Sequence, residues 1–202
     1  LSKPFDIEEI PLLFLKSEKD RKNQRLIQHS LEKRRKKTAN LYFEGSFGDD
    51  LMQLTKVTDV DHRLTADLPP VLIDGPTGSG KSTYARWIHD NGPRQDAPFV
   101  AINCSAIPNN LIESELFGHE KGAFTDAKNA RIGLFEAADQ GTLFLDEIAS
   151  LSLEAQAKLL LAIENQIIRR VGGNKEIKVD VRIIGAANQD LRVMIKEGSF
   201  RE

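Results

Sequence analysis

The stretch VLIDGPTGSGKSTYARWIHD, residues 71–90, decides the fold of this chain. Its residues 75–82, GPTGSGKS, match the pattern G-x-x-x-x-G-K-[S/T] at every fixed position. The apolar residues 71–73 predict a short buried strand before the match, and residues 82–90 predict a helix with one apolar face after it. A strand, a glycine-rich turn and a helix in this order are the structural context that a phosphate-binding loop requires.

The residue types in this loop suit a bound phosphate. Glycines let successive backbone N–H groups point into one concavity, and the helix that follows adds the positive end of its dipole. The Lys81 ammonium can reach the β- and γ-phosphates, and the Ser82 hydroxyl can ligate Mg²⁺. A glycine-rich structural turn is the alternative, but the flanking strand and helix favour nucleotide binding. The predicted nucleotide-binding residues are Gly75, Pro76, Thr77, Gly78, Ser79, Gly80, Lys81, Ser82 and Thr83.

Farther along the chain, strands and helices are expected to alternate. Apolar runs at residues 99–102, 142–145 and 179–186 predict three more strands, and residues 153–163 and 191–196 predict helices. Ser152 and Asp190 precede these helices and are expected to cap them. Apolar strands separated by helices indicate a parallel sheet covered on both faces, so the predicted fold class is α/β.

Two adjacent carboxylates, Asp146 and Glu147, follow the strand predicted at residues 142–145. The carboxyl ends of parallel strands line the ligand crevice of an open sheet. We therefore expect Asp146 to hold Mg²⁺ together with Ser82, and Glu147 to polarise the attacking water. A nucleotide-binding scaffold without hydrolysis is the alternative. The second carboxylate favours hydrolysis, because binding alone does not need it.

Composition excludes several other classes of protein. The 202 residues carry 28 Lys and Arg against 30 Asp and Glu. This near-zero net charge lacks the overall positive charge that is typical of nucleic-acid-binding proteins. The one cysteine, Cys104, rules out an intrachain disulfide framework, fits a cytoplasmic protein and is expected to be an inert buried thiol. No apolar run approaches the about 18 residues of a membrane-spanning helix, so no membrane association is expected.

The first 45 residues differ in character from the rest. Residues 16–37 contain ten Lys and Arg against three acidic residues, which predicts a solvated basic helical linker. A nucleic-acid or partner patch is the alternative, but no aromatic residue lies among the charges. We expect residues 1–45 to be the end of a regulatory domain plus a linker, and residues 46–202 to be the α/β domain.

Residues 115–127, ELFGHEKGAFTDA, resemble the surface-loop signature of bacterial enhancer-binding proteins. These are AAA+ ATPases that activate transcription by the sigma-54 form of RNA polymerase. Stretches that match the family in the same order are NC at 103–104, GTLFLDE at 141–147, RRVGG at 169–173, VDVR at 179–182 and GSFRE at 198–202. The resemblance implies a P-loop AAA+ sheet flanked by helices, with the chain ending before the family's helical lid domain.

The resemblance also implies roles for residues outside the two nucleotide motifs. Asn103 would hold Glu147 in an inactive pose until ATP is sensed, and Asn188 would be the sensor near the γ-phosphate. Arg201 would be the first arginine finger, which reaches the γ-phosphate of the neighbouring subunit. Such a shared site implies a homo-oligomeric ring, usually a hexamer.

Phe124 and Thr125 match the loop tip that engages the sigma factor, so the implied partners are sigma-54 and RNA polymerase. DNA would be bound only by a C-terminal domain beyond this chain. Asp126 stands where the family loop has glycine, which places a negative charge at the contact tip. Ser82 likewise replaces an acidic residue and Ala187 a threonine common in the family. The alternative is an AAA+ remodelling ATPase that acts on another target.

The first ten residues, LSKPFDIEEI, resemble the end of a response-regulator receiver domain. Lys3 would then match the lysine that contacts the phosphoryl group, which would make the protein part of a two-component system. A generic entry into a helix is the open alternative.

Overall fold

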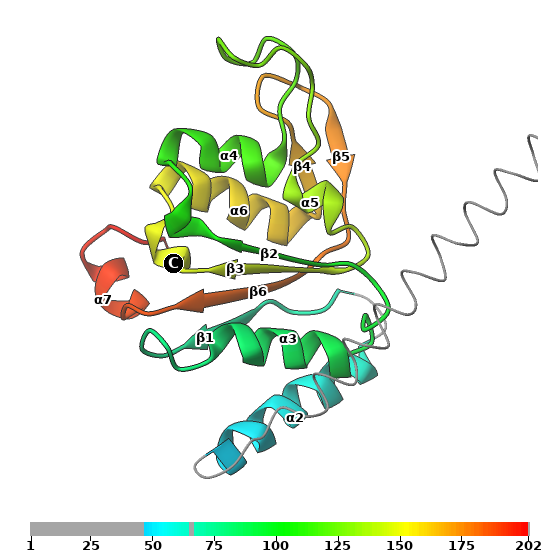
Figure 1. The fold of residues 1–202 in the computed structure, drawn as a ribbon, viewed down its shortest axis with the longest axis vertical. Coiled ribbons are helices and arrows are strands. Elements are labelled where there is room, and N and C mark those ends of the chain that lie inside the picture. Colours follow the sequence, from blue (N-terminus) through cyan, green and yellow to red (C-terminus); the bar gives the residue numbers. More distant parts are fainter. Residues whose placement is uncertain (1–46, 65–66, 202) are drawn as a thin grey trace, which may run out of the picture. The chain divides into compact units, whose positions relative to one another are not determined.

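A computed structural model of the chain describes residues 47–64 and 67–201 (Figure 1). The basic linker and the receiver-like beginning with Lys3 were predicted for residues that lie outside these ranges. The domain boundary between residues 45 and 46 therefore stays a prediction. Within the described ranges, no helix has the length and apolar character needed to cross a membrane.

In the described part of the chain, four parallel strands form one sheet. In sheet order they are β1 (Val71–Asp74), β6 (Arg182–Ala187), β3 (Thr142–Asp146) and β2 (Phe99–Asn103). The helices are α2 (Phe47–Arg63), α3 (Lys81–Asn91), α4 (Asn109–Phe117), α5 (Leu134–Ala137), α6 (Leu153–Asn165) and α7 (Leu191–Lys196). Short 3-10 turns lie at Cys104–Ala106 and Ile148–Ser150, and β4 (Ile167–Arg169) pairs antiparallel with β5 (Glu176–Lys178).

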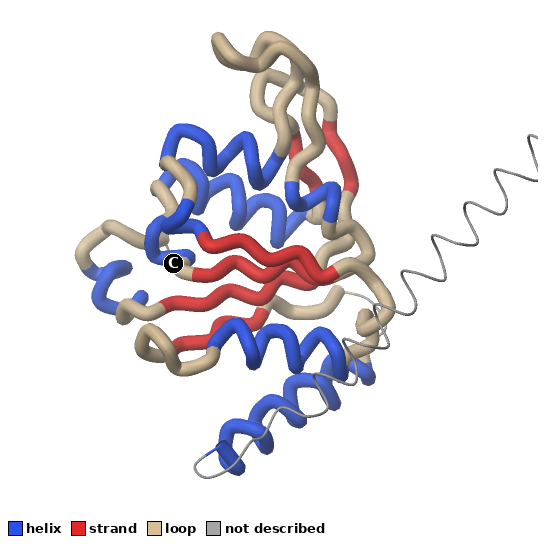
Figure 2. The backbone as a smooth tube through the Cα atoms, in the orientation of Figure 1, coloured by secondary structure: helices blue, strands red, loops and turns tan. Residues whose placement is uncertain are grey.

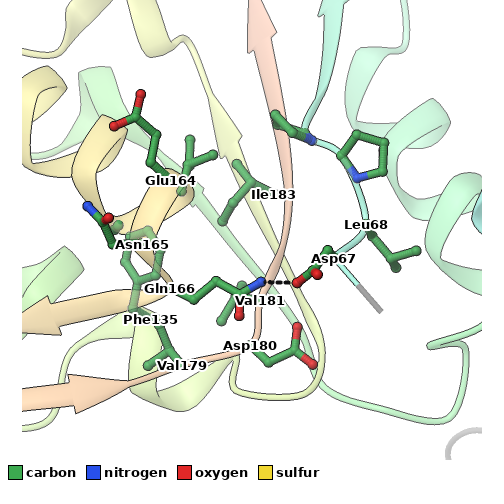
Figure 3. Close-up of a pocket in the computed structure, with 14 residues that line it drawn as sticks. Asp67, Leu68, Phe135, Glu164, Asn165, Gln166, Val179, Asp180, Val181 and Ile183 are labelled. Atoms are coloured by element: carbon green, nitrogen blue, oxygen red, sulfur yellow. Dashed lines mark hydrogen bonds between the residues drawn. The ribbon is translucent and has the colours of Figure 1, made fainter. Parts of the chain in front are cut away.

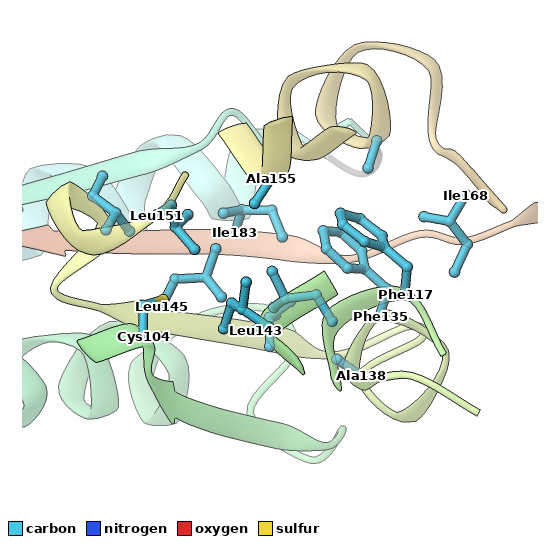
Figure 4. Close-up of a cluster of buried hydrophobic side chains, with 14 of the residues drawn as sticks. Cys104, Phe117, Phe135, Ala138, Leu143, Leu145, Leu151, Ala155, Ile168 and Ile183 are labelled. Carbon is cyan, nitrogen blue, oxygen red and sulfur yellow. The ribbon is translucent and has the colours of Figure 1, made fainter. Parts of the chain in front are cut away.

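Helices cover both faces of this sheet, with α4 and α6 on one face and α2 and α3 on the other (Figures 1 and 2). Successive side chains of the interior strand β3 pack on opposite faces of the sheet. Leu143 and Leu145 enter the cluster under α4 and α6, which Figure 4 shows, whereas Phe144 enters the cluster under α3. These three side chains are at most 3% exposed. The predicted α/β sheet with two covered faces is confirmed.

Both predicted helix caps are confirmed. The Ser152 side chain accepts a hydrogen bond from Ala155 N at the start of α6, and the Asp190 side chain accepts from Arg192 N and Val193 N at the start of α7. Such caps satisfy N–H groups that have no partner within the helix. Helix α7 has the predicted bounds, and α6 is two residues longer than predicted.

Two strand predictions were partly wrong. Strand β6 begins at Arg182 and not at residue 179, because the segment before it makes other contacts: Val179 N bonds to Gln166 O, and Asp180 O accepts from Gln140 N. Strand β1 is not fully buried, and its Leu72 is 54% exposed. The reason is its place at one edge of the described sheet, beside β6.

Helix α2 was not predicted, and a buried ion pair holds it to the sheet. Asp61 accepts two hydrogen bonds from Arg182 Nη2, at 2.7 and 2.9 Å, and both side chains are 3% exposed. Arg182 lies at the start of β6, so the pair connects α2 to an interior strand. Burial raises the pKa of Asp61 and lowers that of Arg182, and each partner's charge opposes the other's shift.

Candidate active site

The predicted site residues gather along the carboxyl edge of the sheet. Because the strands are parallel and lie in the order β1-β6-β3-β2, the segments that follow them meet at one edge. The phosphate loop leaves β1, Asn188 follows β6, the carboxylate pair ends β3, and Asn103 ends β2. Gly75 N donates to Ala187 O at 3.2 Å, which holds the loop against the end of β6.

The phosphate loop has the backbone that its glycines permit. Gly78 and Gly80 have φ angles of 82° and 84°, in the left-handed region that side chains disfavour. Helix α3 begins directly after Gly80, which has no side chain to cap the first turn. The first-turn N–H groups of an 11-residue helix therefore face the loop, where they favour an anion.

The Lys81 side chain folds under this loop. Its ammonium donates to the carbonyl oxygens of Gly75 and Pro76, at 2.8 Å each, and the residue is 7% exposed. A buried ammonium with two carbonyl acceptors is held in place beside the concavity. The loop thus contains one fixed positive charge in addition to its N–H groups.

Asn188 contacts the phosphate loop directly. Its side-chain Nδ2 donates to the Thr77 hydroxyl at 3.3 Å, and both residues are exposed at the mouth of the site. The structure thus brings the predicted sensor residue and the predicted nucleotide-binding residues together.

The carboxylate pair forms a tight turn at the end of β3. Glu147 N donates to Asp146 Oδ1 at 3.0 Å, and Glu147 has φ 54° and ψ 48°, a left-handed conformation. For a residue with a side chain this backbone costs roughly 1–2 kcal/mol, a cost found mainly at functional sites. Both residues are half-buried, so their carboxylates can reach the crevice.

Asn103 lies beside the carboxylate pair, in register with Asp146. Its Oδ1 accepts hydrogen bonds from Ser105 N at 2.9 Å and from Ser105 Oγ at 2.8 Å, so it caps the turn that follows β2. This places Asn103 on the strand next to Glu147, and its control over Glu147 stays a prediction. The next residue, Cys104, is buried, and burial followed by the charges of the two carboxylates raises its thiol pKa to about 12, as expected of an inert thiol.

Arg201 contacts helix α6. Its Nε donates to Leu153 O at 3.3 Å and its N donates to Gln156 Oε1 at 2.9 Å, while the residue itself is exposed. These contacts hold it on the N-terminal turn of α6. Sequence reasoning missed Gln156, because a polar residue on an amphipathic helix is normally solvated.

The predicted partner loop lies between α4 and α5 and extends from the body of the domain beside the β4–β5 hairpin (Figure 1). At its tip Phe124 is 37% exposed and packs edge-on against the His119 ring, with 4.9 Å between centroids, and Thr125 is exposed. Among the described residues, those other than glycine with positive φ are Asp67, Gln140, Glu147 and Gln166, so Asp126 fits its position without left-handed backbone.

Arg170, which precedes the hairpin turn, fastens the base of this loop. It donates two hydrogen bonds to Glu136, at 2.8 and 2.9 Å, and one to Glu120 at 3.2 Å. The bond from Arg170 holds the pKa of Glu136 below its usual value. Gly172 has φ 76° and a Cβ there would lie 2.7 Å from the Ala123 side chain, so the hairpin turn and the loop pack closely.

A separate cavity of about 380 Å³ lies at the opposite edge of the sheet, near the starts of β1 and β6 (Figure 3). Gln166 Nε2 donates to Asp67 Oδ1 at 2.6 Å across it. None of the predicted site residues lines this cavity. The cavity is therefore separate from the site predicted at the carboxyl edge.

Comparison with known proteins identifies relatives that cover about two thirds or nearly all of the chain. Regulatory protein AtoC of Escherichia coli is 44% identical over 207 residues, which cover 99% of this chain and 42% of AtoC. The transcriptional regulatory protein FlbD of Caulobacter vibrioides is 56% identical over 132 residues, 65% of this chain and 29% of FlbD. The chain thus spans less than half the length of these relatives.

Two solved structures of a further protein, NtrX, are also similar to this chain. NtrX from Brucella abortus superimposes with a TM-score of 0.72 at 34% identity, over 100% of this chain and 42% of NtrX. NtrX in complex with ATP superimposes with a TM-score of 0.69 at the same identity, over 100% of this chain and 41% of NtrX. The model of the family described as the sigma-54 interaction domain matches residues 48–202. The chain belongs to the sigma-54 interaction domain family of AAA+ proteins.

Proposed function

We propose that this chain is the ATP-hydrolysing domain of a sigma-54-dependent transcriptional activator, which remodels the sigma-54 RNA polymerase complex in the cytoplasm. The observation that carries the proposal is the carboxyl edge of the sheet. There the phosphate loop, Asn188 and the Asp146–Glu147 pair lie together. The family match and the ATP complex of the similar NtrX support ATP as the nucleotide.

The chain's own residues supply most of the binding site for ATP. Backbone N–H groups of the loop, to which Pro76 contributes none, would hold the phosphates. Lys81 would add a positive charge beside them. Ser82 and Asp146 offer hydroxyl and carboxylate oxygens, the ligand types that Mg²⁺ prefers. When bound there, Mg²⁺ would neutralise part of the phosphate charge.

Hydrolysis requires a water aligned with the γ-phosphorus. Glu147 would polarise this water and accept its proton while the new P–O bond forms and the bond to the β-phosphate oxygen breaks. The products are ADP and inorganic phosphate. Asn188 would donate to the γ-phosphate from its place beside Thr77.

Arg201 would complete the site of a neighbouring subunit. It is exposed and held on α6, which supports a role outside its own phosphate loop. An arginine supplied in this way stabilises transition-state charge and is typically worth ~10³–10⁵ in rate. The working form would be a homo-oligomeric ring, a hexamer by family resemblance.

The Phe124–Thr125 tip would contact sigma-54, and nucleotide-driven movement of this loop would remodel the polymerase complex. The exposure of Phe124 and the family description support this assignment. DNA binding would belong to a domain outside this chain.

The test measures ATP turnover of the full-length gene product against protein concentration, with Glu147→Gln and Arg201→Ala alongside. We expect turnover per protomer to rise steeply with concentration, and both variants to bind ATP but hydrolyse it at least about 100-fold more slowly. Sigma-54 should co-migrate with the wild-type protein in the presence of an ATP transition-state analogue. Turnover that ignores concentration and Arg201 would contradict the shared site. Shared-site turnover without co-migration would indicate a target other than sigma-54, which the negative charge of Asp126 would explain.

A further inference from the structure

Gln156 is a buried polar residue in the first part of α6, and its amide bonds to three backbone atoms outside its own helix. Nε2 donates to Leu151 O at 2.8 Å and to Ser199 O at 3.3 Å, while Oε1 accepts from Arg201 N at 2.9 Å. The residue is 5% exposed. A buried amide bonded through both polar atoms fixes the positions of its partners, because breaking any bond leaves a polar group unpaired.

Two of these bonds hold the segment that carries Arg201. Ser199 and Arg201 flank Phe200, which packs half-buried against the main core cluster. The backbone on both sides of Phe200 is therefore fixed to α6. Because this backbone is fixed, the direction of the exposed Arg201 side chain is fixed as well. The bond from Arg201 Nε to Leu153 O supports this orientation.

The third bond reaches the segment that carries Glu147. Ser150 N donates to Glu147 O at 3.0 Å and Leu151 N donates to Ile148 O at 3.1 Å, so residues 147–151 form one continuous tight turn. Gln156 Nε2 donates to Leu151 O at the end of this turn. One side chain thus joins the segment of the water-polarising carboxylate to the segment of the exposed arginine.

We propose that Gln156 is the positioning residue for Arg201: it fixes the orientation in which each subunit presents Arg201 to its neighbour's nucleotide, and its bond to Leu151 O holds the Gln156 amide itself in place. This inference rests on the proposed shared-site ATPase. The hydrogen bonds of the Gln156 side chain go to backbone atoms of Leu151, Ser199 and Arg201, so it acts through the position of Arg201. A change at Gln156 should therefore damage the neighbour's active site and leave the subunit's own nucleotide binding intact.

The first measurement compares two glutamines near the two ends of α6 in the full-length gene product. Gln156→Met keeps the length of the side chain and removes its hydrogen bonds. Gln166→Met makes the same change at the other end of α6, where the lost bond is to Asp67. We expect Gln156→Met to lower kcat about 10–100-fold, as a misplaced catalytic group does, with ATP affinity unchanged. Gln166→Met should keep wild-type kcat.

The second measurement separates positioning from a general structural role by mixing subunits. Lys81→Ala protomers have a defective nucleotide site but an intact Arg201. Mixed one to one with Gln156→Met protomers, they should restore turnover to up to about a quarter of wild type. Half of all nucleotide sites are then intact, and with random mixing half of those sites face a neighbour whose Arg201 is correctly held. Neither variant alone should show this turnover. If Gln156→Met does not fold, Gln156→Glu, which loses both donated bonds, replaces it.

Arg201→Ala mixed with Lys81→Ala is the reference. Equal recovery in the two mixtures supports the inference. Recovery with Arg201→Ala but not with the Gln156 variant overturns it, because the defect then lies within the subunit's own site. If the Arg201→Ala mixture itself does not recover, the shared site of the proposed function is wrong, and the inference falls with it.

Discussion

The Asn188 amide donates to the Thr77 hydroxyl across 3.3 Å, so the end of β6 is bonded to the phosphate loop. Thr77 lies between Pro76, whose carbonyl oxygen accepts from the Lys81 ammonium, and the left-handed Gly78. Asn188 therefore lies where a change in the position of the loop reaches its amide directly.

Replacing Asn188 by aspartate should show whether the residue acts through its hydrogen-bond donor or only through its place beside the loop. A carboxylate at this position cannot donate to a phosphate oxygen and adds a negative charge, although it can still accept from Thr77. We expect kcat to fall about 100-fold, the usual effect of losing one preorganised donor. Steady-state ATP turnover measures this, with Thr77→Ser as a control that keeps the hydroxyl. Wild-type turnover in Asn188→Asp would contradict the sensor role.

The left-handed backbone of Glu147 predicts an unusual effect of glycine. Glu147→Gly should be about 1 kcal/mol more stable to urea unfolding than Glu147→Ala, because glycine adopts φ 54° without a Cβ penalty. Both variants lack the carboxylate and should be inactive. At Glu154, inside the first turn of α6, the order should reverse, with glycine less stable than alanine. The same order at both sites would refute the strain at Glu147.

Phe124→Ala should remove sigma-54 contact and leave ATP hydrolysis unchanged. The ring lies in the loop between α4 and α5 and packs against His119, whereas the predicted nucleotide-binding residues follow the strands β1, β3 and β6. Sigma-54 co-migration and transcription activation are the readouts, and ATP turnover is the internal control. Activation that survives the substitution would show that another surface makes the contact.

Arg170 and Arg169 make a matched pair for measuring the loop's anchor. Arg170 is 22% exposed and bonds to the 16%-exposed Glu136, whereas Arg169 and its partner Glu176 are 60% and 55% exposed. We expect Arg170→Met to cost about 2 kcal/mol in urea unfolding and Arg169→Met less than about 0.5 kcal/mol. Equal costs would mean that the Arg170 pair does not anchor the loop.

His89 should make the domain less stable in mild acid. Burial and then the Arg86 guanidinium lower its pKa to about 4, while the unfolded chain has the ordinary value of 6.5. Between these pH values the unfolded chain binds a proton that the folded chain does not. The free energy of unfolding is therefore unaffected above about pH 6.5 and falls by about 3 kcal/mol as the pH drops to 4.

His89→Asn tests this dependence. Asparagine can keep a polar atom near Thr142 Oγ1, which lies 2.9 Å from the His89 Nδ1, but it does not titrate. Urea unfolding of both proteins at about pH 7.5, 5.5 and 4.5 should show a smaller acid loss in the variant. Parallel pH profiles would contradict the lowered pKa of His89.

The sequence allowed the phosphate loop, the four parallel strands and the helix caps to be predicted, because each depends on local pattern. Other features depend on distant partners. Helix α2 is fixed by Asp61 and Arg182, which are 121 residues apart, and charged residues do not normally predict burial. The strands β4 and β5 have three residues each, too few for a periodic signal.

The finer geometry of the site was also beyond sequence reasoning. Asp146 and Glu147 were recognisable as a pair, but nothing in their order indicates the left-handed turn of Glu147. Gln156 reads as a solvated position on an amphipathic helix, and it is buried because three backbone groups from other segments need its amide. The exposure of Leu72 follows from the order of the strands, which an apolar run does not specify.

The buried Asp61–Arg182 pair has a mechanical consequence. Strand β6 is fully buried, and its two ends lie about 17 Å apart. Arg182 at one end bonds to Asp61 of α2, and Asn188 follows the other end. A pulling force applied to the start of α2 would be transmitted by the Asp61–Arg182 pair to β6, an interior strand. It would not act first on a strand at the edge of the sheet. The domain therefore has a stiff connection between α2 and the predicted phosphate loop.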